Sequence, residues 1–350
     1  MNERIQLLDC TLRDGCLGLE DAYLNQISDT RLSDNERIEL GEILIATNAD
    51  IVEIGSIQMT DDDREGFAIY QSIEHISRHV LKKKNNGQQI VALFRGPDTP
   101  IEKITCRKEG MIDGVRVILR YSELKESLEF CKALAEKGYK VYIQPMVTAR
   151  YTADELNLVL EYANEMEAYA LYFVDSYGYM MSEDIIRFTG LFDEKLNKKI
   201  RIGFHGHNNM NMAFANAITF INYKTDRHII IDSTATGMGQ GAGNLQTEII
   251  SNYLIKNFEK KYDYKFVLAA CEYVEKYNRD GLWGYSVMGS LPAVHGVAYK
   301  YSIYLRKTYH LPYVEIQRLL DILDTMPDEI RYRYTKDNVK KLLEIGKVKV

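Results

Sequence analysis

Two short strings of polar residues, far apart in the chain, contain the residue types from which a metal site can be built. The first contains Arg13 and Asp14, and the second contains His205 and His207. One carboxylate and two imidazoles are a common ligand set for a divalent cation that leaves coordination positions open for substrate. Arg13 would place a fixed positive charge beside the metal. If the two strings meet in space, the sequence predicts an enzyme with Asp14, His205 and His207 as metal ligands.

The elements that must position these residues are short apolar, β-branched runs that alternate with helical patterns. Eight strands are expected, at residues 5–9, 51–54, 90–94, 114–119, 140–143, 171–174, 200–204 and 229–232. Two capping boxes, Ser33 to Glu36 and Thr152 to Glu155, indicate helix starts. Eight strand–helix units over roughly 250 residues predict a (β/α)8 TIM barrel. A doubly wound sheet is the alternative, but its glycine fingerprint is missing after the first strand.

The chain divides into two parts that differ in their predicted secondary structure. Residues 1–255 are predicted to form the TIM-barrel catalytic domain. Residues 256–350 contain helical patterns without further strands, at residues 266–277, 294–309 and 314–323. We therefore expect an α-helical C-terminal extension packed on the barrel.

Both strings fall where a barrel places catalytic groups, at the C-terminal ends of strands. Asp14 follows the first strand, and the two histidines end the seventh. Alternate strands contribute to the same interior layer, so Asp14 could reach the same ion as His205 and His207. Without this placement, a helix-capping aspartate and two ordinary polar histidines would be the simpler interpretation.

A glycine-rich loop follows the eighth strand, at residues 237–244. Its four glycines would let the backbone approach a ligand closely, and Asn244 could supply a fourth, amide-oxygen ligand. A phosphate-binding loop and a tight turn into the next helix are both compatible with this pattern.

Composition limits the class of protein. The 350 residues carry a net charge of -6, which argues against nucleic acid or an anionic membrane surface as the main partner. No apolar run is long enough to predict a membrane span. Five scattered cysteines without a CxxC pair suit a reducing cytoplasm.

Five motifs together resemble the metal-dependent lyase and aldolase superfamily. They lie at residues 9–15 (DCTLRDG), 52–55 (VEIG), 174–178 (VDSYG), 203–208 (GFHGHN) and 237–244 (GMGQGAGN). The superfamily includes 3-hydroxy-3-methylglutaryl-CoA lyase, isopropylmalate and homocitrate synthases, and 4-hydroxy-2-oxovalerate aldolase, whose branch this chain resembles most. The resemblance implies a (β/α)8 barrel with Mn2+ or Mg2+ held by Asp14, His205 and His207. It also implies Asn244 as a ligand, by analogy with the CoA lyase branch.

The chemistry that the resemblance implies is carbon–carbon bond cleavage or formation through a metal-stabilised enolate. The expected reaction is reversible cleavage of a 4-hydroxy-2-oxo acid to pyruvate and an aldehyde. Arg13 would stabilise the developing oxyanion. The alternative for Arg13 is a structural salt bridge with Glu53 or Asp9.

One residue departs from the aldolase branch. That branch usually has a basic histidine three residues after the ligand aspartate, where this chain has Leu17. The proton-transfer step therefore needs another group, and the candidates are a metal-bound water, Tyr177, Tyr285 and His295. Tyr285 lies in a segment that resembles one leaning over the aldolase barrel mouth. Candidate substrate-binding residues are Arg95, Arg116, Gln144 and Glu53, of which the arginines could equally form structural ion pairs and Glu53 could brace Arg13.

Two other functions stay open from the sequence. One is a Claisen-type synthase or lyase acting on an acyl-CoA. The other is a catalytically weak barrel that acts as a protein partner. Because the aldolase branch often docks to an aldehyde dehydrogenase through its helical part, such a partner or a homo-oligomer is also expected.

Overall fold

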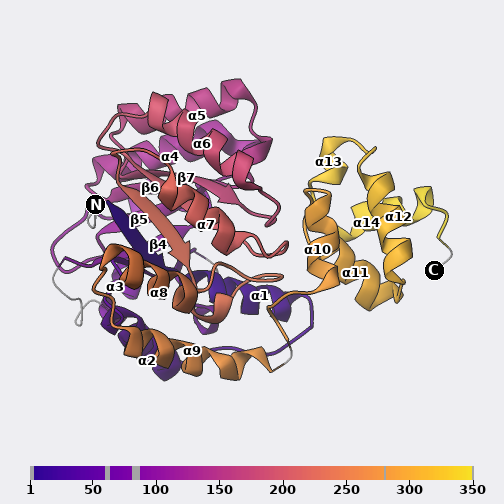
Figure 1. Ribbon diagram of the computed structural model, residues 1–350, viewed down its shortest axis with the longest axis horizontal. Helices are drawn as coiled ribbons and strands as arrows, with labels where there is room; N and C mark the ends of the chain where they lie inside the picture. Colours follow the sequence, from indigo (N-terminus) through magenta and orange to yellow (C-terminus); the bar gives the residue numbers. More distant parts are fainter. Residues whose placement is uncertain (1–3, 60–63, 81–86, 280, 349–350) are drawn as a thin grey trace.

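The computed structural model describes residues 4–59, 64–80, 87–279 and 281–348, and a closed parallel barrel forms most of it (Figure 1). The sheet order is β1-β9-β8-β7-β6-β5-β4-β2-β3, and β1 also pairs with β2, which closes the barrel. The strands are β1 (Ile5–Asp9), β2 (Ile51–Ile57), β3 (Ile69–Tyr70), β4 (Gln89–Phe94), β5 (Gly114–Leu119), β6 (Lys140–Pro145), β7 (Ala170–Asp175), β8 (Arg201–Gly206) and β9 (Ile229–Ser233). The TIM barrel expected from the sequence is confirmed.

Each of the eight predicted runs corresponds to a barrel strand, so β8 and β9 are the seventh and eighth strands around the barrel. The remaining strand, β3, has two residues and pairs with β2 alone. It was not predicted because two residues are too short to show an alternating pattern.

Helices surround the barrel between successive strands. They are α1 (Cys16–Leu24), α2 (Asp34–Ala46), α3 (Ile73–Val80), α4 (Leu124–Glu136), α5 (Ala153–Glu165), α6 (Ser182–Lys195), α7 (Ala213–Asn222) and α8 (Thr247–Phe258). Both predicted capping boxes are present, because Ser33 and Thr152 accept from the backbone of the glutamate three residues on. Each box satisfies helix N–H groups that have no partner within the helix.

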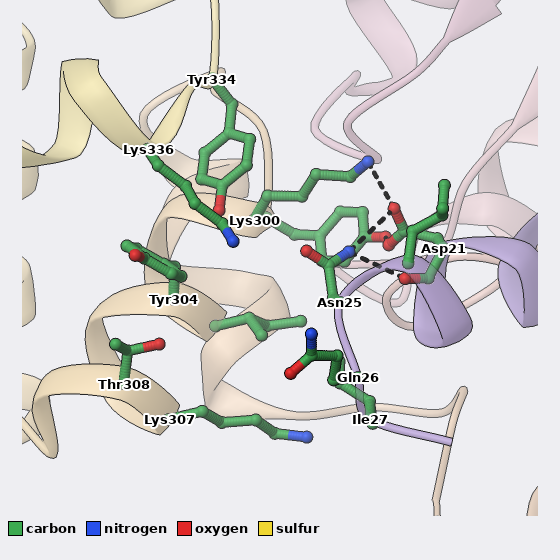
Figure 2. Close-up of a pocket in the computed structure, with 13 residues that line it drawn as sticks. Asp21, Asn25, Gln26, Ile27, Lys300, Tyr304, Lys307, Thr308, Tyr334 and Lys336 are labelled. Carbon is green, nitrogen blue, oxygen red and sulfur yellow. Dashed lines mark hydrogen bonds and ion pairs between the residues drawn. The ribbon is translucent and has the colours of Figure 1, made fainter. Parts of the chain in front are cut away.

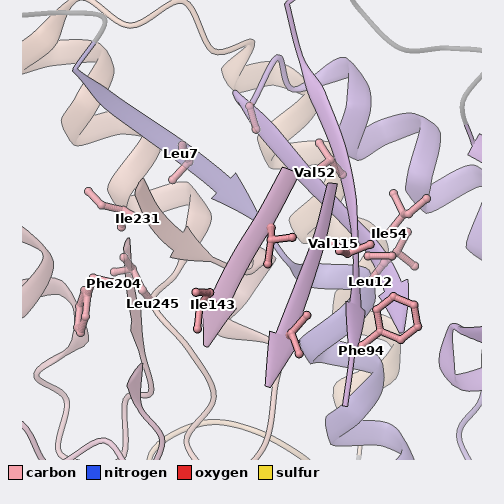
Figure 3. Packing of buried hydrophobic residues seen from close by; sticks show 14 of the residues in the cluster. Leu7, Leu12, Val52, Ile54, Phe94, Val115, Ile143, Phe204, Ile231 and Leu245 are labelled. Atoms are coloured by element: carbon pink, nitrogen blue, oxygen red, sulfur yellow. The ribbon is translucent and has the colours of Figure 1, made fainter. Parts of the chain in front are cut away.

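Side chains of the strands alternate between two apolar layers, as the period of a β-strand requires. Outward-facing residues such as Leu7, Val52 and Ile143 join the main core between strands and helices (Figure 3). Inward-facing residues such as Leu8 and Tyr172 form a separate cluster inside the barrel. The same alternation places polar residues of β5, β8 and β9 inside the barrel, nearer its C-terminal end.

The C-terminal helices are α9 (Tyr264–Glu275), α10 (Val287–Val294), α11 (Lys300–Tyr309), α12 (Tyr313–Leu323), α13 (Asp328–Arg331) and α14 (Lys336–Ile345). Three buried residues of α9 (Ala270, Cys271 and Val274) belong to the barrel core, whereas α10, α11, α12 and α14 share a second apolar cluster. These later helices form a lobe beside the barrel, facing α1 (Figure 1). The predicted boundary between residues 255 and 256 stays a prediction. The first three residues of the predicted barrel domain and the last two residues of the predicted C-terminal region lie outside the described part of the chain.

The helix predicted at residues 294–309 begins too early, because α11 starts only at Lys300. The pattern at residues 294–309 is interrupted between α10 and α11, where Gly296 has a φ of +63°. A left-handed glycine ends a helix, since it turns the backbone away from the helical path. Among the described residues, no helix is both long and apolar enough to cross a membrane.

Candidate metal centre and reaction cavity

The first string lies on a single π-helical turn directly after β1. This turn spans Thr11–Gly15, and its residues are buried. It is fixed at its start, because Thr11 N donates to Asp9 (2.9 Å) and Thr11 Oγ1 accepts from Ala235 N after β9 (2.8 Å). Such turns are frequent at functional sites. The π-helical turn places the Asp14 carboxylate over the end of the barrel.

The second string brings two imidazoles to the same place. His205 lies within β8, and His207 follows its last residue. The Nε2 atoms of His205 and His207 lie 3.7 and 3.8 Å from Asp14 Oδ2. One ligand atom from each of the three residues can be chosen so that all lie within 4.8 Å of one another. The sequence-distant ligand set thus converges in space.

Hydrogen bonds to the other ring nitrogens fix the orientation of both histidines. His205 Nδ1 lies 2.8 Å from Asp232 Oδ2, and His207 Nδ1 lies 3.0 Å from the Asp175 carbonyl oxygen. Both oxygens can only accept, so each Nδ1 carries the proton when the ring is neutral. Each Nε2 then presents a lone pair toward Asp14, which is the arrangement of a metal-binding histidine.

The protonation states also suit a cation. Burial and, to a smaller extent, the neighbouring His205 lower the pKa of His207 to about 4, so the ring is neutral at neutral pH. Burial opposes ionisation of Asp14, but Arg13 and the two histidines outweigh it and hold the pKa of this carboxyl well below its usual range. A neutral imidazole and an ionised carboxylate are the forms that bind metals.

Beneath the ligands, buried charges alternate in sign. Arg13 contacts Asp14 and donates from Nε to Glu53 Oε2 (2.8 Å). Arg116 donates to the same Glu53 oxygen (2.6 Å) and contacts Asp232, the partner of His205. Three carboxylates and two guanidiniums leave one surplus negative charge beside the two imidazoles. A bound cation would balance this charge, since buried charges are costly unless paired.

Asn244 lies at the edge of this set. Its Nδ2 donates to Asp14 Oδ2 (2.6 Å) and to the Met238 carbonyl oxygen (3.1 Å), while its Oδ1 is buried without a partner in the described residues. The loop that holds it is tightly closed, because Gly243 has a φ of +81° and a Cβ there would lie 1.8 Å from the Gly237 carbonyl oxygen. Asn244 thus contacts one candidate ligand and has one free acceptor for a cation.

A cavity of about 170 Å³ opens above the candidate ligands. Of the residues singled out in the sequence, it is lined by Arg13, Asp14, Gln144, Tyr177, His205 and His207. Leu17 of α1 also lines it, and so do Tyr299 and Lys300 of the C-terminal region. The candidate metal site and the C-terminal lobe therefore share one cavity.

Six other predicted residues lie outside the lining of this cavity: Asn244, His295, Tyr285, Arg95, Arg116 and Glu53. Tyr285 is 62% exposed and lines a neighbouring pocket. Arg95 forms a salt bridge with Glu20 (2.7 Å). Arg116 and Glu53 are fully buried in the charge network below the ligands. The salt bridge weighed as the alternative for Arg13 is formed with Glu53.

Sequence reasoning missed two residues that shape the site. Asp232 is the last inward-facing residue of β9, and its polar type at a strand end was the signal that could have identified it. Tyr299 precedes α11 in a region without a motif, so no local signal connects it to the cavity.

A second group of metal-ligating types, Cys10, His205 and Asp232, lies nearby. Burial raises the pKa of Cys10 well above its usual value, and its Sγ donates to the Ser233 carbonyl oxygen (3.3 Å). Asp232 is already held by Arg116. This second group therefore suits a cation less well than the first.

Comparison with known proteins gives consistent matches over the barrel. The HMGL-like family model matches residues 4–274. A 4-hydroxy-2-oxovalerate aldolase from Pseudoalteromonas translucida is 28% identical over 262 residues, which are 72% of this chain and 70% of the relative. An oxaloacetate decarboxylase from Mycobacterium tuberculosis is 28% identical over 250 residues, which are 70% of this chain and 68% of the relative.

Solved structures show the same fold. The HMG-CoA lyase of Bacillus subtilis superposes with a TM-score of 0.62 at 17% identity, covering 79% of this chain and 94% of that one. The carboxyl transferase domain of Rhizobium etli pyruvate carboxylase, solved with pyruvate, superposes with a TM-score of 0.69 at 14% identity. That match covers 98% of this chain and 60% of the other, so it extends over the C-terminal helices.

Proposed function

Because the chain belongs to the HMGL-like family, we propose that it is a divalent-metal-dependent aldolase acting on a 2-oxo acid. The proposed reaction is the reversible cleavage of a 4-hydroxy-2-oxo acid to pyruvate and an aldehyde. The observation that carries the proposal is the convergence of Asp14, His205 and His207 beside Arg13 at one cavity. The named aldolase relatives support the same reaction class.

Asp14, His205 and His207 would hold Mn2+ or Mg2+, with the free Oδ1 of Asn244 as a further donor. When bound, the cation would act as a Lewis acid toward the keto oxygen of the substrate and so favour the enolate. The neutral His207 imidazole, the ionised Asp14 carboxylate and the surplus negative charge all fit such a cation.

The residues of the chain have distinct tasks in this proposal. Arg13 is held by Asp14 and Glu53 through Nη1 and Nε, so its guanidinium is fixed before substrate arrives. A preorganised cation of this kind stabilises charge that develops on an oxygen. Gln144 lines the cavity and its buried Nε2 has no partner in the described residues, so this amide can donate to a substrate carboxylate.

A second reaction is favoured by Leu17. Its apolar side chain lines the cavity at a position from which a basic residue could otherwise accept a proton. Loss of CO2 from a 2-oxo diacid gives the same enolate without removing a hydroxyl proton. Decarboxylation of oxaloacetate, the activity for which one relative is named, is therefore the second candidate function.

Deuterium exchange into the methyl group of pyruvate, followed by NMR with Mn2+ present, tests the proposal. Exchange is expected for the wild-type protein, because forming the enolate releases a methyl proton. Exchange with acetyl-CoA but not with pyruvate would favour an acyl-CoA enzyme. No exchange together with no bound metal would favour a protein partner without catalysis.

Arg13→Ala is the matched variant for this experiment. It should reduce turnover by about 100-fold or more, in the range seen when a preorganised oxyanion donor is removed. Metal content, measured by elemental analysis, should be unchanged. Near-normal turnover in this variant would contradict the assigned role of Arg13.

A further inference from the structure

Aldol cleavage requires a group that accepts the proton of the substrate hydroxyl as the carbon–carbon bond breaks. The titratable side chains that line the cavity are Arg13, Asp14, Tyr177, His205, His207, Tyr299 and Lys300. Three of these would hold the cation, and the arginine and lysine are cations themselves. Among the described lining residues, two tyrosines are therefore left for proton transfer.

The two tyrosines differ in what lies behind their hydroxyls. Tyr299 Oη donates a hydrogen bond to Asp21 Oδ2 at 2.5 Å, so this carboxylate is positioned to accept the Tyr299 proton. The hydroxyl of Tyr177 has no such carboxylate partner in the part of the chain that the structure describes; this residue is held through its carbonyl oxygen, which accepts from Asn209. Tyr299 is thus the tyrosine that can pass a proton onward.

Asp21 lies outside the reaction cavity, on the side of Tyr299 that faces two neighbouring pockets. It lies on α1, one helical turn after Leu17, and lines two outer pockets that do not include the metal ligands. In the pocket drawn in Figure 2, Lys300 Nζ lies 2.5 Å from Asp21 Oδ1, and Asn25 Nδ2 lies 3.3 Å from the same oxygen. Lys300 thus forms an ion pair with the carboxylate that accepts the hydrogen bond of Tyr299.

We propose that Tyr299 and Asp21 form a proton relay between the reaction cavity and the outer pockets, with Tyr299 as the catalytic residue and Asp21 as the residue that acts through it. This assignment rests on the proposed aldol reaction. The substrate O–H bond breaks and its proton bonds to Tyr299 Oη, while the Tyr299 proton moves to Asp21 Oδ2. The freed O–H electron pair forms the aldehyde carbonyl. The electron pair of the breaking carbon–carbon bond forms the enolate.

The cycle closes without a net change in protons. The enolate takes a proton at carbon from solvent, and Asp21 releases its proton to solvent through the outer pockets. Burial and the negative charge of Asp21 raise the pKa of Tyr299 well above its usual value. Tyr299 is therefore protonated before substrate reacts. Its hydroxyl can pass its own proton to Asp21 as it accepts the substrate proton, and no preformed phenolate is needed.

The test compares two reactions in the Mn2+-loaded protein. Tyr299→Phe should lower kcat for cleavage of 4-hydroxy-2-oxovalerate by about 100-fold or more, the usual size of a general acid–base contribution. CO2 release from oxaloacetate should stay within about 3-fold of wild type, because that step removes no hydroxyl proton. Asp21→Asn should also lower kcat for cleavage of 4-hydroxy-2-oxovalerate, with little change in KM.

Tyr304→Phe is the matched control. Tyr304 lies on α11 and lines an outer pocket but not the reaction cavity, so its loss should leave both reactions unchanged. Bound Mn2+ and the melting temperature of each variant show whether it is folded. Asp21→Asn keeps an acceptor for Tyr299, and it provides the test if Tyr299→Phe does not fold.

The outcomes separate the relay from the reaction on which it rests. Normal cleavage by folded Tyr299→Phe would overturn the relay while leaving the aldolase proposal intact. An equal loss of cleavage and decarboxylation would also overturn it, since a general structural defect affects both. A wild-type protein that binds Mn2+ but neither cleaves nor decarboxylates would overturn the proposed function itself.

Discussion

The contacts behind the candidate ligands determine how well the site can bind a cation. Asp232 fixes the tautomer of His205 through a 2.8 Å hydrogen bond. Asp232→Asn should weaken Mn2+ binding by about 10- to 100-fold, the usual effect of removing such a partner. Calorimetric titration measures this, with Asp184→Asn, a substitution at a partly exposed residue of α6, as control. Unchanged affinity would show that Asp232 does not orient the ligand.

Asp9 gives a pH dependence of stability that does not involve the ligands. Burial raises its pKa to about 6 from 3.8, against the hydrogen bonds from Thr11 and Thr247. The folded state therefore favours the protonated acid. This stabilisation is complete below the unfolded pKa and is lost as the pH rises through about 6.

Asp9→Asn removes this titration while keeping an acceptor for Thr11 and placing a donor near Thr247. Between about pH 5 and pH 7.5, the metal-free wild type should lose roughly 1.4 kcal/mol of unfolding free energy relative to the variant. Urea unfolding across this range measures the difference. Parallel pH profiles for the two proteins would mean that Asp9 is ionised in the folded state.

At the scale of elements, the two capping boxes provide a matched pair. Glu36 of α2 also accepts from Lys276 Nζ and Tyr277 Oη at 2.9 Å each, which ties α2 to the residues after α9. Glu155 of α5 has the same capping role with a longer contact, 3.3 Å, from Tyr121. Glu36→Ala should therefore cost about 1 kcal/mol more unfolding free energy than Glu155→Ala. Equal losses would show that the contacts to Lys276 and Tyr277 add nothing.

The sequence predicts elements well where local pattern and local structure agree. β-branched runs identify all eight barrel strands, and Ser33 and Thr152 identify two helix starts. The π-helical turn at Thr11–Gly15 has no distinct pattern, because it depends on its contact with Ala235 in the segment after β9. Gly296 interrupts an apolar pattern that otherwise continues, so the break between α10 and α11 was missed.

The candidate site shows the same division between local and long-range information. Arg13, Asp14, His205 and His207 could be proposed together because a barrel topology brings strand ends together. The Tyr299–Asp21 contact joins segments 278 positions apart through packing of the C-terminal lobe, and no motif reports it. The roles of Tyr285 and Arg95, and a partner protein on the C-terminal helices, stay predictions.

At the scale of the whole molecule, the barrel and the C-terminal lobe have separate apolar clusters. Leu320 of α12 is fully buried in the second cluster. Leu320→Ala should cost about 2–5 kcal/mol within the lobe, as loss of a buried leucine generally does. Hydrogen exchange should accelerate in α10–α14 while the barrel strands stay protected. Loss of protection throughout the chain would show that the two clusters unfold together.

The match to the HMGL-like family, the barrel and the ligand set lead to one central claim, that Asp14, His205 and His207 hold a divalent cation. Titration of the chelator-treated protein with Mn2+, followed by electron paramagnetic resonance, tests it most directly. About one Mn2+ per chain is expected for the wild type, with at least roughly 100-fold weaker binding for His207→Ala, which loses a candidate ligand. A wild type that binds no Mn2+, or a His207→Ala variant that binds it equally well, would contradict this ligand assignment.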